Sequence, residues 1–175
     1  ELSIEIIHLH YNSLTGPLPS FRAISTISEL LVYGNRLSGT IPIDTFAACT
    51  ALEVLILHEN MFSGNIAFLD NIKSPVLRAV VLDSNGFTGT LPTKIFDSTS
   101  LHLFSASSNC LSGEIKEDVC LAVNMETLLL GSVTSGESCQ QKIWANTPFK
   151  NRWNSFTVKD WLEGSIPACV VSMPK

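Results

Sequence analysis

The chain has 175 residues, of which 45% are apolar and 15% are charged, and its formal net charge is −5. This length suits one domain with a sizeable core, and the shortage of basic residues argues against a nucleic-acid partner. The longest apolar runs, such as Val54 to Leu57, are too short to cross a bilayer, so we expect no membrane span. Glu1 leads directly into a strand-like pattern without the features of a signal peptide. We therefore expect either a removed leader or an internal piece of a longer chain.

One motif, Asn-x-Leu/Phe-Ser/Thr-Gly-x-Ile/Leu, occurs five times in phase, at residues 12–19, 35–42, 60–67, 85–92 and 109–116. Its asparagines lie 23, 25, 25 and 24 positions apart. Apolar residues recur eight, five and three positions before each asparagine. This spacing predicts short strands, in chain order, around residues 7–9, 30–32, 55–57, 80–82 and 104–106. Met125, Leu128 and Leu130 predict a sixth strand on the same schedule.

Each repeat is expected to form one coil, because a single copy could not bury its apolar side alone. Stacked coils would align their strands as a parallel sheet with a spacing of about 4.8 Å. We expect each motif asparagine to turn inward and to satisfy backbone groups where its strand ends. The motif glycine then permits a backbone conformation that is costly for other residues.

These repeats resemble the plant-type extracellular leucine-rich repeat, over residues 2–133 and again at 162–167. The resemblance implies an α/β-type solenoid of about six to seven coils, with a parallel sheet on the concave face and an irregular, 3-10 or short-helical back. It also implies a secreted or cell-surface location and a recognition role. The chain departs from the pattern where Ala67 and Lys116 replace proline, and neither cysteine-containing terminal cap is visible.

The sixth repeat is interrupted, because the spacing of the motif glycines rises from 24 (Gly89 to Gly113) to 51 (Gly113 to Gly164). We therefore divide the chain into repeats at 1–133, an insertion at 134–161 and a resumed repeat at 162–175. The insertion resembles, in position only, the island of some plant hormone receptors, and it is similar to a unit in large algal repeat proteins.

All three tryptophans of the chain, Trp144, Trp153 and Trp161, fall in the insertion. The aromatic residues could form a small core of their own. Alternatively, exposed rings could stack on a glycan or anchor a protein partner, and on this hypothesis we predict contacts from Trp144, Phe149, Arg152 and Trp153.

The five cysteines cannot all pair, and none has the spacing of a zinc site. The extracellular resemblance favours disulfides. We predict a bridge between Cys120 and Cys139, with Cys139 to Cys169 as the alternative. Cys49 occupies a core position, where we expect a buried thiol.

Residues that alternate with the core positions should form the concave surface. One column comprises His8, Leu31, Ile56, Val81, Ser105 and Leu129, and the column beside it comprises His10, Tyr33, His58, Asp83, Ser107 and Gly131. We predict partner contacts from five of these residues: Leu31, Tyr33, Ile56, His58 and Val81. Plain packing is the alternative for the aliphatic members.

The sequence shows no phosphate-binding loop, nucleophile elbow or paired carboxylates, so we expect no enzymatic activity. His10 and His58 should lie two coils apart, about 10 Å, which is too far for one metal, and we expect neither a metal site nor a cofactor. The predicted function is non-enzymatic extracellular recognition of a protein or polysaccharide. The alternative is a structural subunit of a fibre or wall layer, in which copies of the chain stack end to end.

Overall fold

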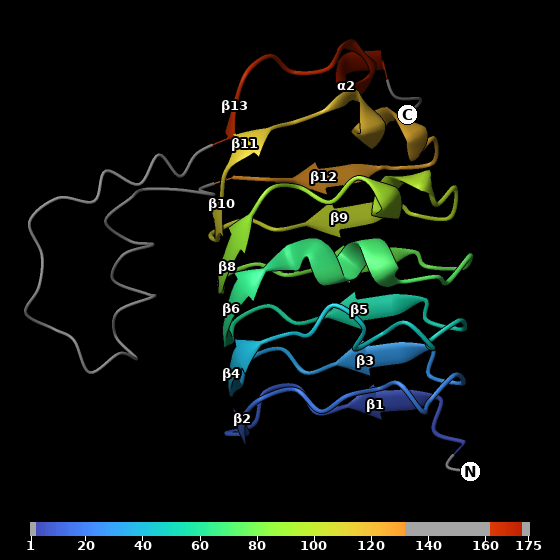
Figure 1. Ribbon diagram of the computed structural model, residues 1–175, viewed down its shortest axis with the longest axis vertical. Coiled ribbons are helices and arrows are strands. Elements are labelled where there is room, and N and C mark those ends of the chain that lie inside the picture. The colour runs from blue at the N-terminus through green and yellow to red at the C-terminus, as the bar shows by residue number, and fades with distance from the viewer. Residues whose placement is uncertain (1–2, 132–161, 173–175) are drawn as a thin grey trace, which may run out of the picture.

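The computed structural model describes residues 3–131 and 162–172. Successive coils stack along one axis, with the N-terminal coil at one end and the helix α2 at the other (Figure 1). Every strand pairing joins a coil to the next coil, and every pairing is parallel. The predicted solenoid with a parallel sheet is therefore confirmed.

The larger sheet carries one short strand from each of six coils, in the order β1-β3-β5-β7-β9-β12. These strands are β1 (Ile6–His8), β3 (Glu29–Leu31), β5 (Val54–Ile56), β7 (Ala79–Val81), β9 (Leu103–Ser105) and β12 (Thr127–Leu129). The register places Leu30, Leu55 and Val80 side by side, and all three are buried. Alternation then turns Leu31, Ile56 and Val81 to the concave face, as predicted, whereas Ser105 of the same predicted column is buried.

A second parallel sheet, which the sequence analysis did not predict, runs in the order β10-β8-β6-β4-β2. Its strands are β2 (Thr15–Gly16), β4 (Arg36–Thr40), β6 (Met61–Asn65), β8 (Gly86–Gly89) and β10 (Cys110–Leu111). A separate pair joins β11 (Gly113–Glu114) to β13 (Leu162–Glu163). Gly64 shows why the motif needs glycine: its φ is +81°, and a Cβ there would lie 2.7 Å from Cγ2 of Thr40 on the preceding coil.

The back of the solenoid is built from short helical turns, as predicted. These are η1 (Ile66–Asn71), η2 (Lys94–Asp97), η3 (Glu117–Leu121) and α2 (Ala168–Ser172). Phenylalanines fill the space between the back and the sheets: Phe46, Phe68 and Phe87 form a continuous series with centroid distances of 6.0 Å. All three rings are buried. No helix in the described ranges is both long and apolar enough to span a membrane.

Buried asparagines satisfy backbone groups where the strands end, as the sequence predicted, and they also join neighbouring coils. Nδ2 of Asn85 donates to the carbonyl of Leu82 in its own coil and to that of Leu57 in the coil before, each at 3.0 Å. Its Oδ1 accepts from the backbone N–H of Phe62 at 3.0 Å. Asn35, Asn60 and Asn109 make the same set of contacts.

Candidate functional site

The concave face carries a ribbon of aliphatic side chains. Parallel register sets Leu31, Ile56 and Val81 in one row across β3, β5 and β7, and each is half-buried. Val54 and Ala79, which form the next row on β5 and β7, are also half-buried. We call these five residues the aliphatic ribbon. Because their outer sides remain accessible, the ribbon offers apolar contact area to a partner.

Three aromatic rings stack beside the ribbon. The ring of Tyr33 lies between those of His10 and His58, with centroid distances of 4.7 and 4.3 Å and interplanar angles of 5° and 15°. We call these three residues the ring stack. It forms because the strand spacing of parallel coils, about 4.8 Å, is close to the distance at which flat rings pack face to face. Tyr11 is 69% exposed and meets Tyr33 edge-on at 5.1 Å.

The ring stack leaves its outer polar atoms free. Nδ1 of His10 and Nδ1 of His58 are buried and have no hydrogen-bond partner among the described residues. Nε2 of His10, Nε2 of His58 and the hydroxyl of Tyr33 also have no hydrogen-bond partner among the described residues. Unlike the two Nδ1 atoms, they are accessible to solvent. A partner on the concave face would therefore meet three polar tips in a row.

Two pairs of oppositely charged residue types join neighbouring coils at the ends of strands in the larger sheet. Nε2 of His8 lies 2.7 Å from Oε2 of Glu29, and Nη2 of Arg78 lies 2.8 Å from Oε2 of Glu53. All four side chains are partly solvent-exposed, so each pair contributes little to stability.

Asp83 holds the same position in its coil as His10, Tyr33 and His58 hold in the three coils before it. Its carboxylate therefore continues the column of the ring stack. Its oxygens accept from Oγ of Ser105 at 2.6 and 2.7 Å, and from the backbone N–H of Ser107. Ser105 is buried. These hydrogen bonds hold the carboxylate in one orientation at the end of β7.

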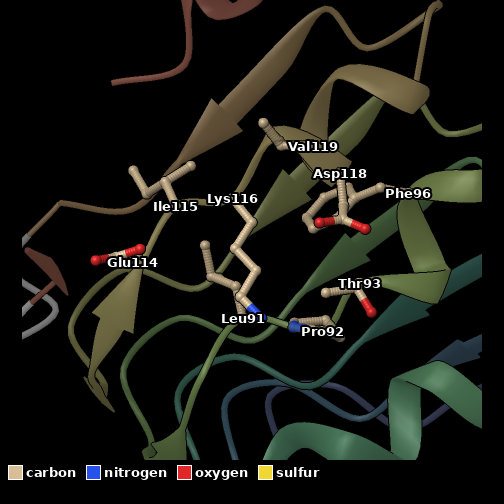
Figure 2. Close-up of a pocket in the computed structure, with 9 residues that line it drawn as sticks. All are labelled: Leu91, Pro92, Thr93, Phe96, Glu114, Ile115, Lys116, Asp118 and Val119. Carbon is tan, nitrogen blue, oxygen red and sulfur yellow. The ribbon is translucent and has the colours of Figure 1, made fainter. Parts of the chain in front are cut away.

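A pocket between Leu91 and Val119, on the turns that follow the second sheet, has a volume of about 10 Å³ (Figure 2). That is room for about one water molecule, so it is too small for a ligand. Residues 3–131 and 162–172 contain no group of three histidine, cysteine or acidic side chains placed to bind a metal ion.

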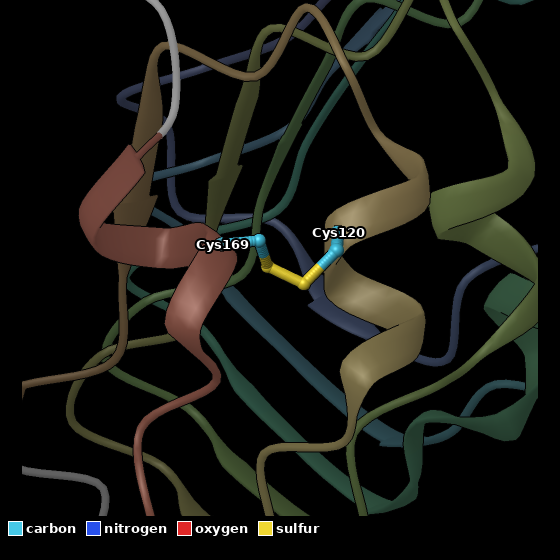
Figure 3. Close-up of a disulfide and its surroundings, with 2 residues drawn as sticks. All are labelled: Cys120 and Cys169. Carbon is cyan, nitrogen blue, oxygen red and sulfur yellow. A yellow bond between two sulfur atoms is a disulfide. The ribbon is translucent and has the colours of Figure 1, made fainter.

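The predicted bridge between Cys120 and Cys139 is wrong. Cys120 on η3 pairs with Cys169 on α2, with a Cα–Cα distance of 5.7 Å (Figure 3). This also excludes the alternative pairing of Cys139 with Cys169. The reason is the coil geometry: β13 pairs directly with β11, which sets α2 beside η3 on the back although 49 residues separate the two cysteines.

The other described cysteines differ in their surroundings. Cys110 also takes part in a disulfide. Cys49 is a free thiol and is fully buried, as predicted. Burial raises its pKa to about 11.

The structure brings together five of the predicted contact residues, Leu31, Ile56 and Val81 in the aliphatic ribbon and Tyr33 and His58 in the ring stack. Trp144, Phe149, Arg152 and Trp153 lie outside the described residues. The sequence analysis placed His10 in the same column as Tyr33 and His58 but did not predict their stacking. The coil spacing itself was the signal, because rings at one position of adjacent coils must meet.

Comparison with solved structures identifies the fold. The ectodomain of the Arabidopsis thaliana membrane receptor kinase GASSHO1/SCHENGEN3, in complex with CASPARIAN STRIP INTEGRITY FACTOR 2, matches with a TM-score of 0.68 and 32% identity, over 73% of this chain and 15% of that one. The chain has the plant-type leucine-rich repeat fold. No protein-family model and no curated protein matches its sequence.

Two further leucine-rich repeat structures extend this comparison. The Arabidopsis receptor kinase HAESA, in complex with the peptide hormone IDA and the co-receptor SERK1, matches with a TM-score of 0.66 and 28% identity, over 71% of this chain and 21% of that one. The ectodomain of the Arabidopsis thaliana receptor kinase SOBIR1 matches with a TM-score of 0.60 and 30% identity, covering 68% and 64%. The chain therefore spans less than two thirds of the length of each of these three structures.

Proposed function

We propose that this chain is a non-enzymatic, extracellular recognition module that binds a protein partner across its concave face. The observation that carries this proposal is the aliphatic ribbon beside the ring stack, since both leave accessible side chains on one continuous sheet surface. Similar ectodomains whose structures contain a peptide hormone or a protein co-receptor support the choice of a protein partner.

The test uses the 175-residue chain to select binders from a displayed library of random peptides. Ile56→Glu places a charge in the middle of the aliphatic ribbon and should weaken the selected binders by about tenfold or more. Ile43→Glu is the matched control, because Ile43 is 58% exposed and lies on a turn away from the concave face. Equal loss in both variants, or no loss in either, would contradict the proposal.

The insertion is a second proposed contact surface, on sequence grounds. Trp144→Ala together with Trp153→Ala should weaken binding of a protein or glycan partner, while the circular dichroism of the repeats stays unchanged. If the concave binders bind this double variant as they bind the natural chain, these tryptophans do not contribute.

End-to-end association of copies is the second candidate function. It is favoured by the apolar side chains that the first coil exposes, namely Ile4, Ile6, Leu9 and Leu14. Sedimentation velocity over a range of concentrations distinguishes the two candidates. A monomer at all concentrations would exclude end-to-end association, whereas larger species that disappear on substituting Leu9 by glutamate would support it.

A further inference from the structure

The carboxylate of Asp83 is held by hydrogen bonds from the following coil. Both of its oxygens accept from the buried Ser105 hydroxyl, and one also accepts from the backbone N–H of Ser107. A carboxylate held by three such contacts has already lost its rotamer freedom. A cation that binds it therefore loses less entropy than one that binds a mobile side chain.

Asp83 also lacks a cationic partner among the described residues. The nearest basic residue along its own coil, Arg78, pairs with Glu53 at 2.8 Å. No lysine, arginine or histidine of residues 3–131 and 162–172 forms an ion pair with Asp83. Its two donors, the Ser105 hydroxyl and the Ser107 N–H, are both neutral. The negative charge is therefore oriented but not neutralised, on a side chain that stays partly exposed.

The surroundings of Asp83 combine apolar and aromatic surfaces. Val81 points to the same face two residues earlier, about 6.6 Å away along the strand. The column continues on the preceding coil with His58, whose ring stacks on Tyr33. Glu59, which follows His58, is exposed, and its backbone N–H donates to the carbonyl of Asp83 at 2.9 Å. An incoming cation would thus meet negative charge next to the aliphatic ribbon.

We propose, resting on the function proposed above, that the concave face binds an extended peptide that places an arginine on Asp83 and aliphatic side chains on the ribbon. A guanidinium fits because its planar donors match a fixed carboxylate and its face can stack on a ring such as that of His58. Alternate residues of an extended chain repeat at about 6.7 Å. Two aliphatic side chains at that interval fit within the row from Val81 to Leu31, which covers two coil spacings, or about 9.6 Å.

The probe is the labelled peptide acetyl-Arg-Ser-Leu-Ser-Leu-amide, made also in the reverse order, and compared with the same peptides carrying citrulline in place of arginine. Citrulline keeps the planar shape and removes the charge. Fluorescence anisotropy with the 175-residue chain should show that citrulline weakens binding of the better peptide about tenfold. Added salt should weaken the arginine peptide and leave the citrulline peptide unchanged.

The variant Asp83→Asn should lose the preference for arginine. Asp97→Asn, which removes the same charge from an exposed position on η2, should keep it. Circular dichroism checks that both variants fold. If Asp83→Asn does not fold, the salt titration of the natural chain tests whether the arginine charge contributes to binding. The proposal is overturned if neither peptide binds, if arginine and citrulline bind equally, or if Asp83→Asn keeps the preference.

Failure of this proposal is distinguishable from failure of the proposed function. If Ile56→Glu weakens the library-selected binders while arginine and citrulline peptides bind equally, the concave face is a recognition surface without an arginine site. If Ile56→Glu and Ile43→Glu behave alike, recognition by the concave face is itself wrong.

Discussion

The carboxamide of Asn60 lies among backbone groups of two coils. Its Nδ2 donates to the carbonyls of Val32 and Leu57 at 3.0 and 3.1 Å, and its Oδ1 accepts from the N–H of Leu37 at 3.0 Å. Asn60→Ala should lower the free energy of unfolding by about 3 kcal/mol, because it leaves these buried groups without partners. Urea denaturation followed by circular dichroism measures this loss.

Asn12 provides the control at the same motif position. It donates only to Leu9 and His10 of its own coil, and it is exposed to water, which can replace those contacts. Asn12→Ala should therefore cost about 1 kcal/mol or less. Equal losses for the two variants would show that the bonds between coils are not what makes Asn60 stabilising.

The thiol of Cys49 should be almost inert in the folded chain. With its pKa raised to about 11, about one molecule in a thousand carries the thiolate at pH 8, which is the reactive form. Iodoacetamide should label Cys49 quickly in urea and very slowly without it, as measured by mass spectrometry. Similar rates in both conditions would contradict the burial of Cys49.

The same thiol links stability to pH. Its pKa is higher in the folded chain than in the unfolded chain, so the unfolded chain releases this proton first as the pH rises. The contribution of Cys49 to the free energy of unfolding should be complete below pH 9 and should decline between about pH 9 and pH 11. Comparing the natural chain with Cys49→Ala over this range isolates the effect.

Among the elements, α2 depends on the disulfide that links it to η3. The bridge between Cys120 and Cys169 closes a loop across 49 positions, worth about 4 kcal/mol in the chain-entropy model. In the double variant Cys120→Ser/Cys169→Ser, amides of α2 and β13 should exchange hydrogen faster, while those of β3 and β5 keep their rates. Uniform acceleration across the chain would show instead that the bridge stabilises all coils together.

The sequence predicted the strands well because each one repeats its apolar spacing in phase. It did not predict the second sheet, because the segment from Arg36 to Thr40 contains no run of apolar alternation and pairs mainly through its backbone. The ring stack and the bridge to Cys169 depend on which coils become neighbours. That information is absent from any single repeat, since β13 joins β11 across residues that break the period.

At the scale of the whole molecule, each coil contacts mainly the coils on either side, so stability should be distributed coil by coil. Phe68 packs between Phe46 and Phe87 near the middle of the solenoid, whereas the ring of Phe21 meets one other aromatic ring of the described residues, that of Phe46. Phe68→Ala should cost about 4 kcal/mol and uncouple the two halves, giving two unfolding transitions. Phe21→Ala should loosen only the first coils.

Hydrogen exchange of β3 and β9 separates these outcomes. In Phe68→Ala the two strands should lose protection at different urea concentrations. In Phe21→Ala only β1 and β3 should change. A single transition for Phe68→Ala would mean that the sheets couple all coils more strongly than nearest-neighbour contacts imply.

The buried asparagines also set which parts of a coil can change length. From the centre of each strand to its asparagine the count is always five, as from Leu55 to Asn60, while whole coils measure 23 to 25 residues. All of the length variation therefore falls in the remainder of the coil, between one asparagine and the next strand. A residue inserted before the asparagine would carry its carboxamide away from the carbonyls of the coil below. A residue inserted on the back of a coil would only lengthen a turn. The back is therefore the part of each coil where a peptide tag or a protease cleavage site should be tolerated.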